Sequence, residues 1–233
     1  MTEDELQRIR SAYSRRDEAP TTPYRWDNPG YVFYMQTVER SLLRALDDAG
    51  VLLADARVLD VGCGSGYFLH RLREYGAGEC VGIDLMEDRI AVGRQRYPTL
   101  DLRVGSATEL PYGDRAFDLV TQFTCLSSIL QDDVRLAAAH EMKRVARGGW
   151  VLSFDMRGRR PLMSRRPKMS ASTPTIALDR RELVRLFGEP VMLRREALAF
   201  EVAQRMGRHS LIGTVLGTVP PLRSHLLGLW RVT

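Results

Sequence analysis

The chain has 233 residues, of which 44% are hydrophobic and 27% are charged, and its formal net charge is +5. This composition is typical of a folded globular protein, and at roughly 150 residues per domain the length fits one or two domains. The chain contains no apolar run of about 18 residues and begins with an acidic segment, so neither a membrane-spanning helix nor a secretory signal is expected.

The three cysteines, Cys63, Cys80 and Cys125, are far apart and form no Cys-x-x-Cys pair. This spacing argues against a disulfide framework and against a zinc site. We therefore expect a cytoplasmic protein without a metal site.

Positive charge is concentrated in the last third of the chain. Residues 1–155 carry 19 lysines and arginines against 24 acidic residues, whereas residues 156–233 carry 15 against 5. A basic excess of this kind suits an anionic partner, which could be a small molecule or a nucleic acid.

The first 50 residues are predicted to form two helices joined by a loop. Residues 3–19 have the pattern of a charged helix, residues 20–30 hold three prolines, and residues 31–49 show helical apolar spacing. We interpret residues 1–50 as an N-terminal helical lid on a main domain of residues 51–233, the whole forming a single compact unit.

From Arg57 onward, short β-branched runs alternate with helical segments. The pattern predicts strands at 58–61, 80–84, 100–104, 117–122 and 150–154, with helices at 67–75, 87–95 and 132–146. Beyond a basic loop, it predicts a helix at 178–187 capped by Asp179, a strand at 191–200, an ambiguous helix within 201–219 and a last strand at 224–232. This alternation indicates an α/β fold with a doubly wound parallel sheet covered by helices.

The most informative motif is Val58-Leu59-Asp60-Val61-Gly62-Cys63-Gly64-Ser65-Gly66, in which a hydrophobic strand enters a glycine-rich loop that opens a helix. Glycines allow positive φ and let a ligand approach the backbone. The spacing is Gly-x-Gly-x-Gly, whereas a dinucleotide fingerprint would place its third glycine at the position of Tyr67.

Two carboxylates flank this loop in the sequence. Asp60 would repel a pyrophosphate but suits a ligand that carries an ammonium group, such as S-adenosylmethionine, which has no phosphate. Asp84 ends the second predicted strand, where a carboxylate can accept hydrogen bonds from both hydroxyls of a ribose.

With these motifs, residues 55–155 resemble the class I S-adenosylmethionine-dependent methyltransferases. Gly105–Pro111 is similar to the family segment that contacts adenine, Ala116–Gln122 to its fourth strand and Glu141–Gly149 to its entry into the fifth. The resemblance implies a mostly parallel seven-stranded sheet of order 3-2-1-4-5-7-6 with an antiparallel seventh strand. It also implies S-adenosylmethionine as cofactor and S-adenosylhomocysteine as product. The cofactor-binding residues implied are Asp60, Gly62, Cys63, Gly64, Gly66, Asp84, Leu85, Ser106, Ala107 and Gln122.

Two segments are candidates for binding the methyl acceptor. Residues 24–34 contain Tyr24, Trp26, Tyr31 and Tyr34, whose rings could attract a sulfonium or stack on a planar substrate. They could equally pack the N-terminal helix onto the domain. The basic segment 157–168, including Arg157 and Arg159, suits an anionic acceptor, and the alternative is a solvated loop.

A nucleic-acid partner is disfavoured. The basic segment contains no interleaved aromatic residues, the fourth strand lacks an Asn-Pro-Pro-Tyr type motif, and Cys125 has no preceding proline. A small-molecule acceptor is therefore expected, bound to a monomer or homodimer without stable membrane insertion.

Methyl transfer is an in-line displacement, in which a general base helps when the acceptor is a hydroxyl or an ammonium group. Asp155, at the carboxyl end of the fifth predicted strand, and His225, at the start of the last, are the candidate catalytic residues. We expect transfer to oxygen or nitrogen, less readily to carbon, of an anionic or sugar-like natural product. Two alternatives remain open: a non-catalytic cofactor-binding partner protein, or an enzyme that methylates a lipid-linked acceptor at a membrane surface through the apolar segment Leu211–Gly217.

Overall fold

The computed structural model describes residues 3–17, 24–157, 168–169, 174–198, 200, 202–203 and 210–233. Within these ranges no helix is long and apolar enough to cross a membrane.

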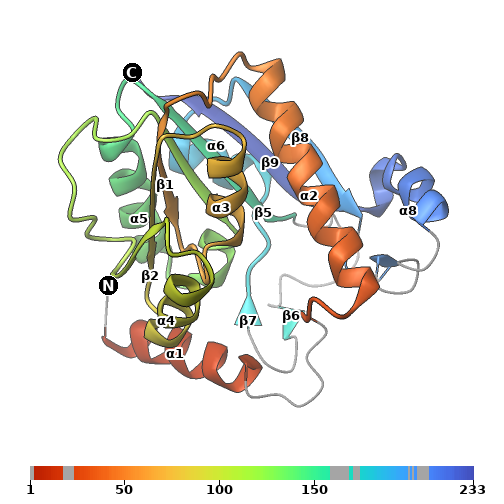
Figure 1. Cartoon of the computed structure of the whole chain (residues 1–233), viewed down its shortest axis with the longest axis horizontal. Helices are drawn as coiled ribbons and strands as arrows, with labels where there is room; N and C mark the ends of the chain where they lie inside the picture. The colour runs from red at the N-terminus through yellow and green to blue at the C-terminus, as the bar shows by residue number, and fades with distance from the viewer. Residues whose placement is uncertain are drawn as a thin grey trace.

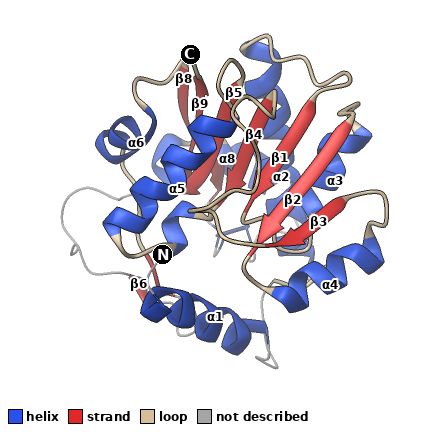
Figure 2. Ribbon diagram, turned by 90° about the vertical axis from the view of Figure 1, so that its left-hand side faces the viewer, coloured by secondary structure: helices blue, strands red, loops and turns tan. Residues whose placement is uncertain are grey.

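A seven-stranded sheet forms the centre of the molecule (Figure 2). Its spatial order is β3 (Asp101–Val104), β2 (Glu79–Asp84), β1 (Arg57–Val61), β4 (Leu119–Phe123), β5 (Trp150–Met156), β9 (Arg223–Arg231) and β8 (Met192–Leu198). The strands from β3 to β5 are parallel, and β9 runs antiparallel to both β5 and β8. This arrangement confirms the expected order, with β8 and β9 as the sixth and seventh strands of the family pattern.

Helices cover both faces of the sheet (Figures 1 and 2). One face packs against α2 (Pro29–Asp48), α3 (Tyr67–Glu74) and α4 (Glu87–Arg96), and the other against α5 (Asp132–Val145) and α6 (Arg180–Phe187). Alternate residues of β1 serve the two cores: Val58 faces the first, whereas Leu59 and Val61 face the second. Burial on both faces explains why the parallel strands are continuous apolar runs in the sequence.

The two helices of the predicted lid lie in different places. α2 buries Val38, Leu42 and Leu46 against the sheet and is therefore part of the core. α1 (Glu3–Asp17) lies beside α4, outside the sheet layers (Figure 1). The division into a lid of residues 1–50 and a domain of residues 51–233 stays a prediction.

Local signals explain several helix ends. Asn28 caps α2 by accepting hydrogen bonds from the backbone N–H groups of Gly30 and Tyr31, and Pro29 occupies the first turn. Asp179 caps α6 by accepting a bond of 3.0 Å from the Glu182 N–H, as the sequence predicted. The basic stretch predicted as a loop contributes a short antiparallel pair, β6 (Lys168–Met169) with β7 (Pro174–Thr175).

Candidate functional site

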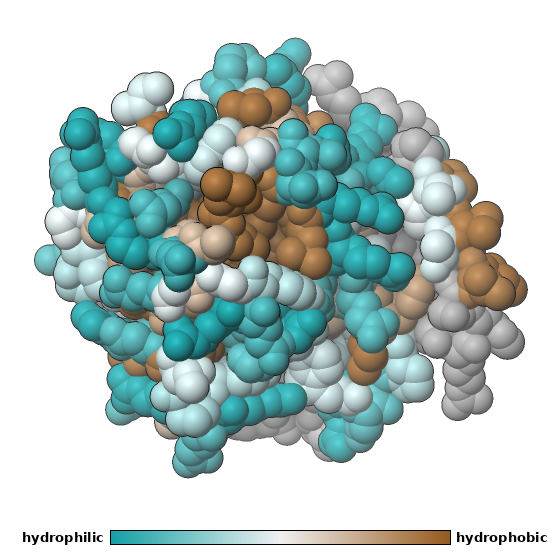
Figure 3. Space-filling view, turned by 45° about the horizontal axis from the view of Figure 1, so that its top comes forward, coloured by the Kyte–Doolittle hydropathy of each residue, from teal (hydrophilic) through white to brown (hydrophobic). Residues whose placement is uncertain are grey.

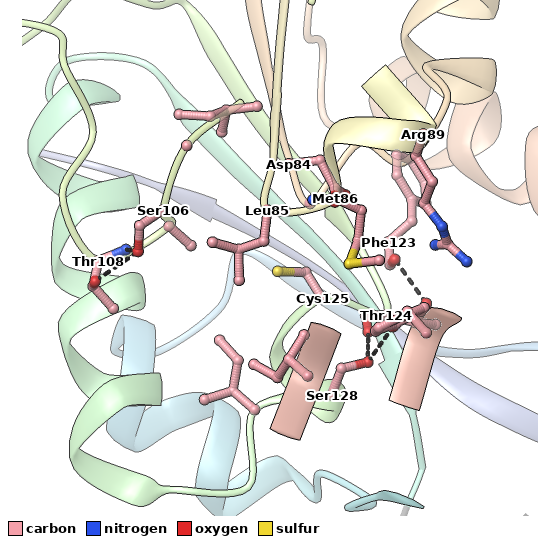
Figure 4. A pocket seen from close by; sticks show the side chains of 17 residues that line it. Asp84, Leu85, Met86, Arg89, Ser106, Thr108, Phe123, Thr124, Cys125 and Ser128 are labelled. Atoms are coloured by element: carbon pink, nitrogen blue, oxygen red, sulfur yellow. Dashed lines mark hydrogen bonds between the residues drawn. The ribbon is translucent and has the colours of Figure 1, made fainter. Parts of the chain in front are cut away.

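A cavity opens at the carboxyl ends of the parallel strands, the edge where ligands bind in doubly wound sheets. It encloses about 760 Å³ of empty space, its open mouth included. Its lining comes from the segments that follow β1, β2, β3 and β4 and from α1. In Figure 4, Ser106 and Thr108 lie at one end and Arg89 at the other, with Leu85, Met86 and Cys125 between them.

The glycine loop after β1 is tied to the end of β2 through Asp84. Its carboxylate accepts one hydrogen bond from the Gly64 N–H, at 2.8 Å, and one from the Met86 N–H, at 2.9 Å. The Gly62 N–H donates to the Ile83 carbonyl at 2.8 Å. Because a carboxylate has about four acceptor positions, Asp84 keeps capacity for further donors on its cavity side.

Gly62 has no room for a side chain. Its φ is +72°, and a Cβ placed on it would lie 2.7 Å from both Cβ and Sγ of Cys125. Cys125 belongs to the turn that follows β4, so the glycine loop and this turn are in direct contact. Burial raises the pKa of the Cys125 thiol, which therefore stays uncharged.

The predicted cofactor residues divide into two groups by position. Gly62, Asp84, Leu85, Ser106 and Ala107 line the cavity. Five others are not among the residues that line it and belong to the glycine loop or to the strands β1 and β4: Asp60, Cys63, Gly64, Gly66 and Gln122.

Asp60 is buried at the end of β1. Its Oδ1 accepts a hydrogen bond of 2.7 Å from the Thr121 hydroxyl. Burial disfavours the charged form and raises the pKa of this carboxyl to about 7. The hydrogen bond from Thr121 opposes this rise in pKa, and the negative charge of Asp84 adds to it. A neighbouring cation would therefore change the ionisation of Asp60 within the physiological pH range.

Gln122 and Asp155 meet in a buried polar network. The Gln122 amide donates to Ser153 Oγ, at 2.6 Å, and to Asp155, while Asp155 also accepts from the Ser153 hydroxyl and the Ser127 N–H. The amide oxygen of Gln122 accepts from the N–H groups of Cys125 and Leu126. The two side chains thus hold the turn after β4, and neither is among the residues that line the cavity.

Burial raises the pKa of Asp155, against the opposing effect of its hydrogen bonds. Both of its carboxylate oxygens are occupied and the residue is 0% exposed. This placement suits a residue that positions the turn better than one that exchanges a proton with an acceptor.

His225 lies at the start of β9 and is also buried. Its Nε2 is 3.2 Å from the Tyr34 hydroxyl and its Nδ1 is 2.9 Å from Ser224 Oγ. The ring stacks on Phe154, with centroids 4.6 Å apart. Burial lowers the pKa of His225 to about 4, so the imidazole is neutral at physiological pH.

The rings predicted to contact the acceptor belong to one aromatic cluster. Trp26 lies 4.6 Å from Tyr67, Phe68 stacks on Phe123 at 4.0 Å, and Phe123 itself lines the cavity. Here "aromatic cluster" denotes Tyr24, Trp26, Tyr31, Tyr34, Tyr67, Phe68, Phe123, Phe154, Phe200 and His225, which are linked by ring contacts.

The predicted basic site falls mostly outside the described residues. Arg157 continues β5, where its N–H donates to the Ser224 carbonyl at 2.8 Å, whereas Arg159 and the rest of 158–167 lie outside the description.

α1 supplies a wall of the cavity through residues that the sequence did not single out. Ile9 and Tyr13 line the cavity, and the Tyr13 hydroxyl lies 2.7 Å from Ser128 Oγ. The Glu5 carboxylate accepts from the Leu130 N–H at 2.8 Å, and Arg8 donates to the Ser128 carbonyl at 2.7 Å. Glu5, Ile9 and Tyr13 are spaced four residues apart and therefore lie on one face of the helix. This spacing is the feature of the sequence from which the face could have been found.

Other lining residues, Met86, Arg89, Thr108, Thr124, Cys125, Ser128 and Ile129, follow strand ends whose positions the sequence did predict. The directions of their side chains depend on the conformations of the loops, and the sequence of a loop has no periodic pattern from which its conformation could be predicted.

Comparison with known proteins identifies the fold. Residues 58–149 match the family model described as a methyltransferase domain. A Mycolicibacterium smegmatis protein described as a probable S-adenosylmethionine-dependent methyltransferase is 31% identical over 150 residues, covering 64% of this chain and 54% of the relative. A demethylmenaquinone methyltransferase of Renibacterium salmoninarum is 34% identical over 109 residues, covering 47% and 44%. The chain thus spans about half the length of the curated relatives it matches.

Among solved structures, one chain of the complex between the Haloferax volcanii Trm112 methyltransferase activator and a methyltransferase superposes with a TM-score of 0.67. The match covers 94% of this chain and 97% of that chain, at 18% sequence identity. At this identity the likeness shows the fold alone.

Proposed function

We propose that this chain, whose residues 58–149 match a methyltransferase-domain model, is a class I S-adenosylmethionine-dependent methyltransferase that transfers a methyl group to an oxygen or nitrogen atom of a small-molecule acceptor. The observation that carries the proposal is the cavity in which Gly62, Asp84 and Ser106 meet at the carboxyl ends of three neighbouring strands. An anionic or sugar-like natural product remains the acceptor class that we infer from the sequence.

The residues of the cavity fit the cofactor. Gly62 lines the cavity with backbone atoms alone, and Asp84 keeps acceptor capacity for ribose hydroxyls. The Ser106 and Thr108 hydroxyls, 2.8 Å apart, supply polar groups for the adenine end, next to the apolar side chain of Leu85. Asp60, although buried, would supply negative charge for the amino group once a nearby cation favours its ionised form. When bound, S-adenosylmethionine supplies the activated methyl group.

The acceptor would bind on the side of the aromatic cluster. Phe123 supports this location because it lines the cavity and also stacks on Phe68. Rings that are half-buried, such as Tyr34, can enclose an acceptor and exclude water from the displacement.

Within this arrangement we assign the general base to His225. Its neutral imidazole can take a proton from an acceptor hydroxyl or ammonium group through the Tyr34 hydroxyl, which lies 3.2 Å from its Nε2. Asp155 would act as a positioning residue, because it holds the turn that carries Cys125 over the glycine loop.

Calorimetric titration with S-adenosylhomocysteine tests the cofactor site. Asp84→Ala removes the carboxylate, and we expect the dissociation constant to rise by about tenfold or more, since charge-assisted hydrogen bonds are lost. Asp101→Ala is the matched control, because Asp101 is an acidic residue that begins β3 and pairs with the exposed Arg103. Equal affinities of the wild type and Asp84→Ala would refute the assigned site.

Methyl transfer to a panel of hydroxyl- and amine-bearing acceptors tests the activity. Tight binding of S-adenosylhomocysteine without transfer to any acceptor would favour the alternative of a non-catalytic partner protein.

A further inference from the structure

Helix α8 (Ser210–Gly217) is apolar on both of its faces, although it lies at the surface. Its inner face packs on α2, where a Cβ on Gly213 would lie 2.8 Å from Cζ of Phe33, and Leu216 joins the same cluster. Its outer face carries Leu211, 82% exposed, and Val215, 66% exposed. Ile212 and Val219 extend this exposed apolar surface, which lies at the right-hand edge of Figure 3, where Figure 1 places α8.

The sequence segments on either side of α8 contain arginines and no acidic residue. Residues 210–222 contain no charged residue, and residues 202–224 contain three arginines, Arg205, Arg208 and Arg223, but no aspartate or glutamate. Arg223 is fixed at the end of the helix, because its Nε donates to the Gly217 carbonyl at 2.7 Å. An apolar surface in an acid-free, arginine-bearing part of the chain matches a partner that is apolar and negatively charged.

We propose that α8 lies in the surface of an anionic lipid bilayer and attaches the protein to it reversibly. Leu211, Ile212 and Val215 would enter the boundary between headgroups and acyl chains, while the arginines that flank the helix would contact anionic headgroups. A second copy of the chain fits this surface less well, because a two-fold contact through α8 would bring Arg223 of both copies close together.

The location of α8 connects the membrane attachment to the proposed function. Only this connection rests on the proposed function, whereas the attachment itself does not. The inner face of α8 contacts Phe33, and the next residue of α2 is Tyr34, a member of the aromatic cluster. A bilayer bound at α8 would therefore lie beside the acceptor side of the site. An acceptor with a lipid tail could reach the site without leaving the membrane.

Vesicle co-sedimentation tests the attachment, independently of activity. We expect the protein to sediment with vesicles of phosphatidylcholine that contain about one-quarter phosphatidylglycerol, and to be released as salt is raised from about 50 to about 500 mM. The double variant Leu211→Ser/Val215→Ser should bind about tenfold more weakly or worse, since it removes exposed apolar area.

Leu52→Ser is the matched control, because Leu52 is 83% exposed and lies before β1, at the opposite end of the strands from the cavity. It should sediment as the wild type does. The proposal is overturned if the wild type does not sediment with anionic vesicles, or if the double variant binds as well as Leu52→Ser. It is also overturned if light scattering shows a dimer that the double variant dissociates while vesicle binding is unchanged. Binding of S-adenosylhomocysteine by all variants would confirm that they are folded. If the wild type sediments with vesicles but does not bind S-adenosylhomocysteine, the proposed function fails and the membrane attachment stands.

Discussion

The Tyr34 hydroxyl lies 3.2 Å from Nε2 of His225, although 191 positions separate the two residues in the chain. α2 brings Tyr34 over the edge of the sheet, and β9 brings His225 to the same edge because it runs antiparallel to β5. The pair joins the helix layer to the sheet at the point where the aromatic cluster begins.

The buried His225 should make the protein less stable in weak acid. Its pKa is about 4 in the folded chain and about 6.5 in an unfolded one. Between these values the unfolded state binds more protons at this residue, so the contribution of His225 to stability should fall by about 3 kcal/mol as the pH drops from 6.5 to 4, while the buried Asp60 carboxyl acts in the opposite direction over the same range. Urea unfolding at a series of pH values measures this slope, and His225→Gln, which has no such titration, should lose this component. A wild type and variant with parallel profiles would contradict the assignment.

Asp60 should make cofactor binding depend on pH in the opposite sense to its effect on stability. Its folded-state pKa of about 7 lies above the unfolded value, so its carboxyl favours the folded state at low pH and loses this contribution between about 4 and 7. Binding of a cationic amino group requires the ionised form, so affinity for S-adenosylhomocysteine should rise between pH 6 and 8. Calorimetry of Asp60→Asn should show weaker binding without this rise. The same rise in both proteins would place its origin elsewhere.

Gly62→Ala should destabilise the protein by about 3 kcal/mol, since the new Cβ meets Cys125 and the backbone φ is positive. The double variant with Cys125→Gly should recover the steric part of this loss but not the backbone part. Thermal unfolding of the two single variants and the double variant gives the coupling energy. Gly113→Ala is the control, because no atom lies within 4 Å of its added Cβ. Additive effects of Gly62→Ala and Cys125→Gly would argue against the contact.

Glu5→Gln should loosen α1 and speed the release of S-adenosylhomocysteine. Glu5 is 3% exposed; burial would raise its pKa, but the bonds from Arg8 and the Leu130 N–H outweigh burial and lower it. Removing this charge should cost about 1–3 kcal/mol of stability. Stopped-flow measurement of dissociation checks the effect on release, with the neighbouring exposed Asp4→Asn as control. An unchanged release rate in Glu5→Gln would mean that α1 does not limit exchange.

Asp155→Asn distinguishes a positioning role from a catalytic one. If Asp155 holds the turn after β4, the variant should weaken S-adenosylhomocysteine binding and lower the melting temperature, because a buried acceptor in the network is lost. A general base would instead leave cofactor affinity unchanged and lower kcat alone. Calorimetry, together with turnover once an acceptor is known, separates the two outcomes.

The sheet could be predicted from the sequence because its signals are local and repetitive. Each predicted strand from 58–61 to 150–154 overlaps an observed strand, and Asp179 caps its helix as expected. The order of the strands came from the family resemblance, since apolar runs alone do not say which strands are neighbours.

The side-chain partners at the strand ends could not be predicted in the same way. Gln122 is paired with Ser153 in the register of β4 and β5, which places its amide next to Asp155. Sequence reasoning put both residues at the correct edge of the sheet but could not tell that they satisfy each other. A polar residue at a strand end serves a ligand or a neighbour, and that choice depends on register.

The place of β9 between β5 and β8 has a consequence for synthesis on the ribosome. β8 leaves the ribosome before β9, yet β9 is the strand that hydrogen-bonds it into the sheet. Until Arg223–Arg231 has emerged, the nascent chain exposes an open edge at β5, and β8 has no neighbour to join. The parallel half of the sheet, which holds the glycine loop and Asp84, can assemble during that interval, so the pocket that we propose for the cofactor would be the first part of the protein to take shape.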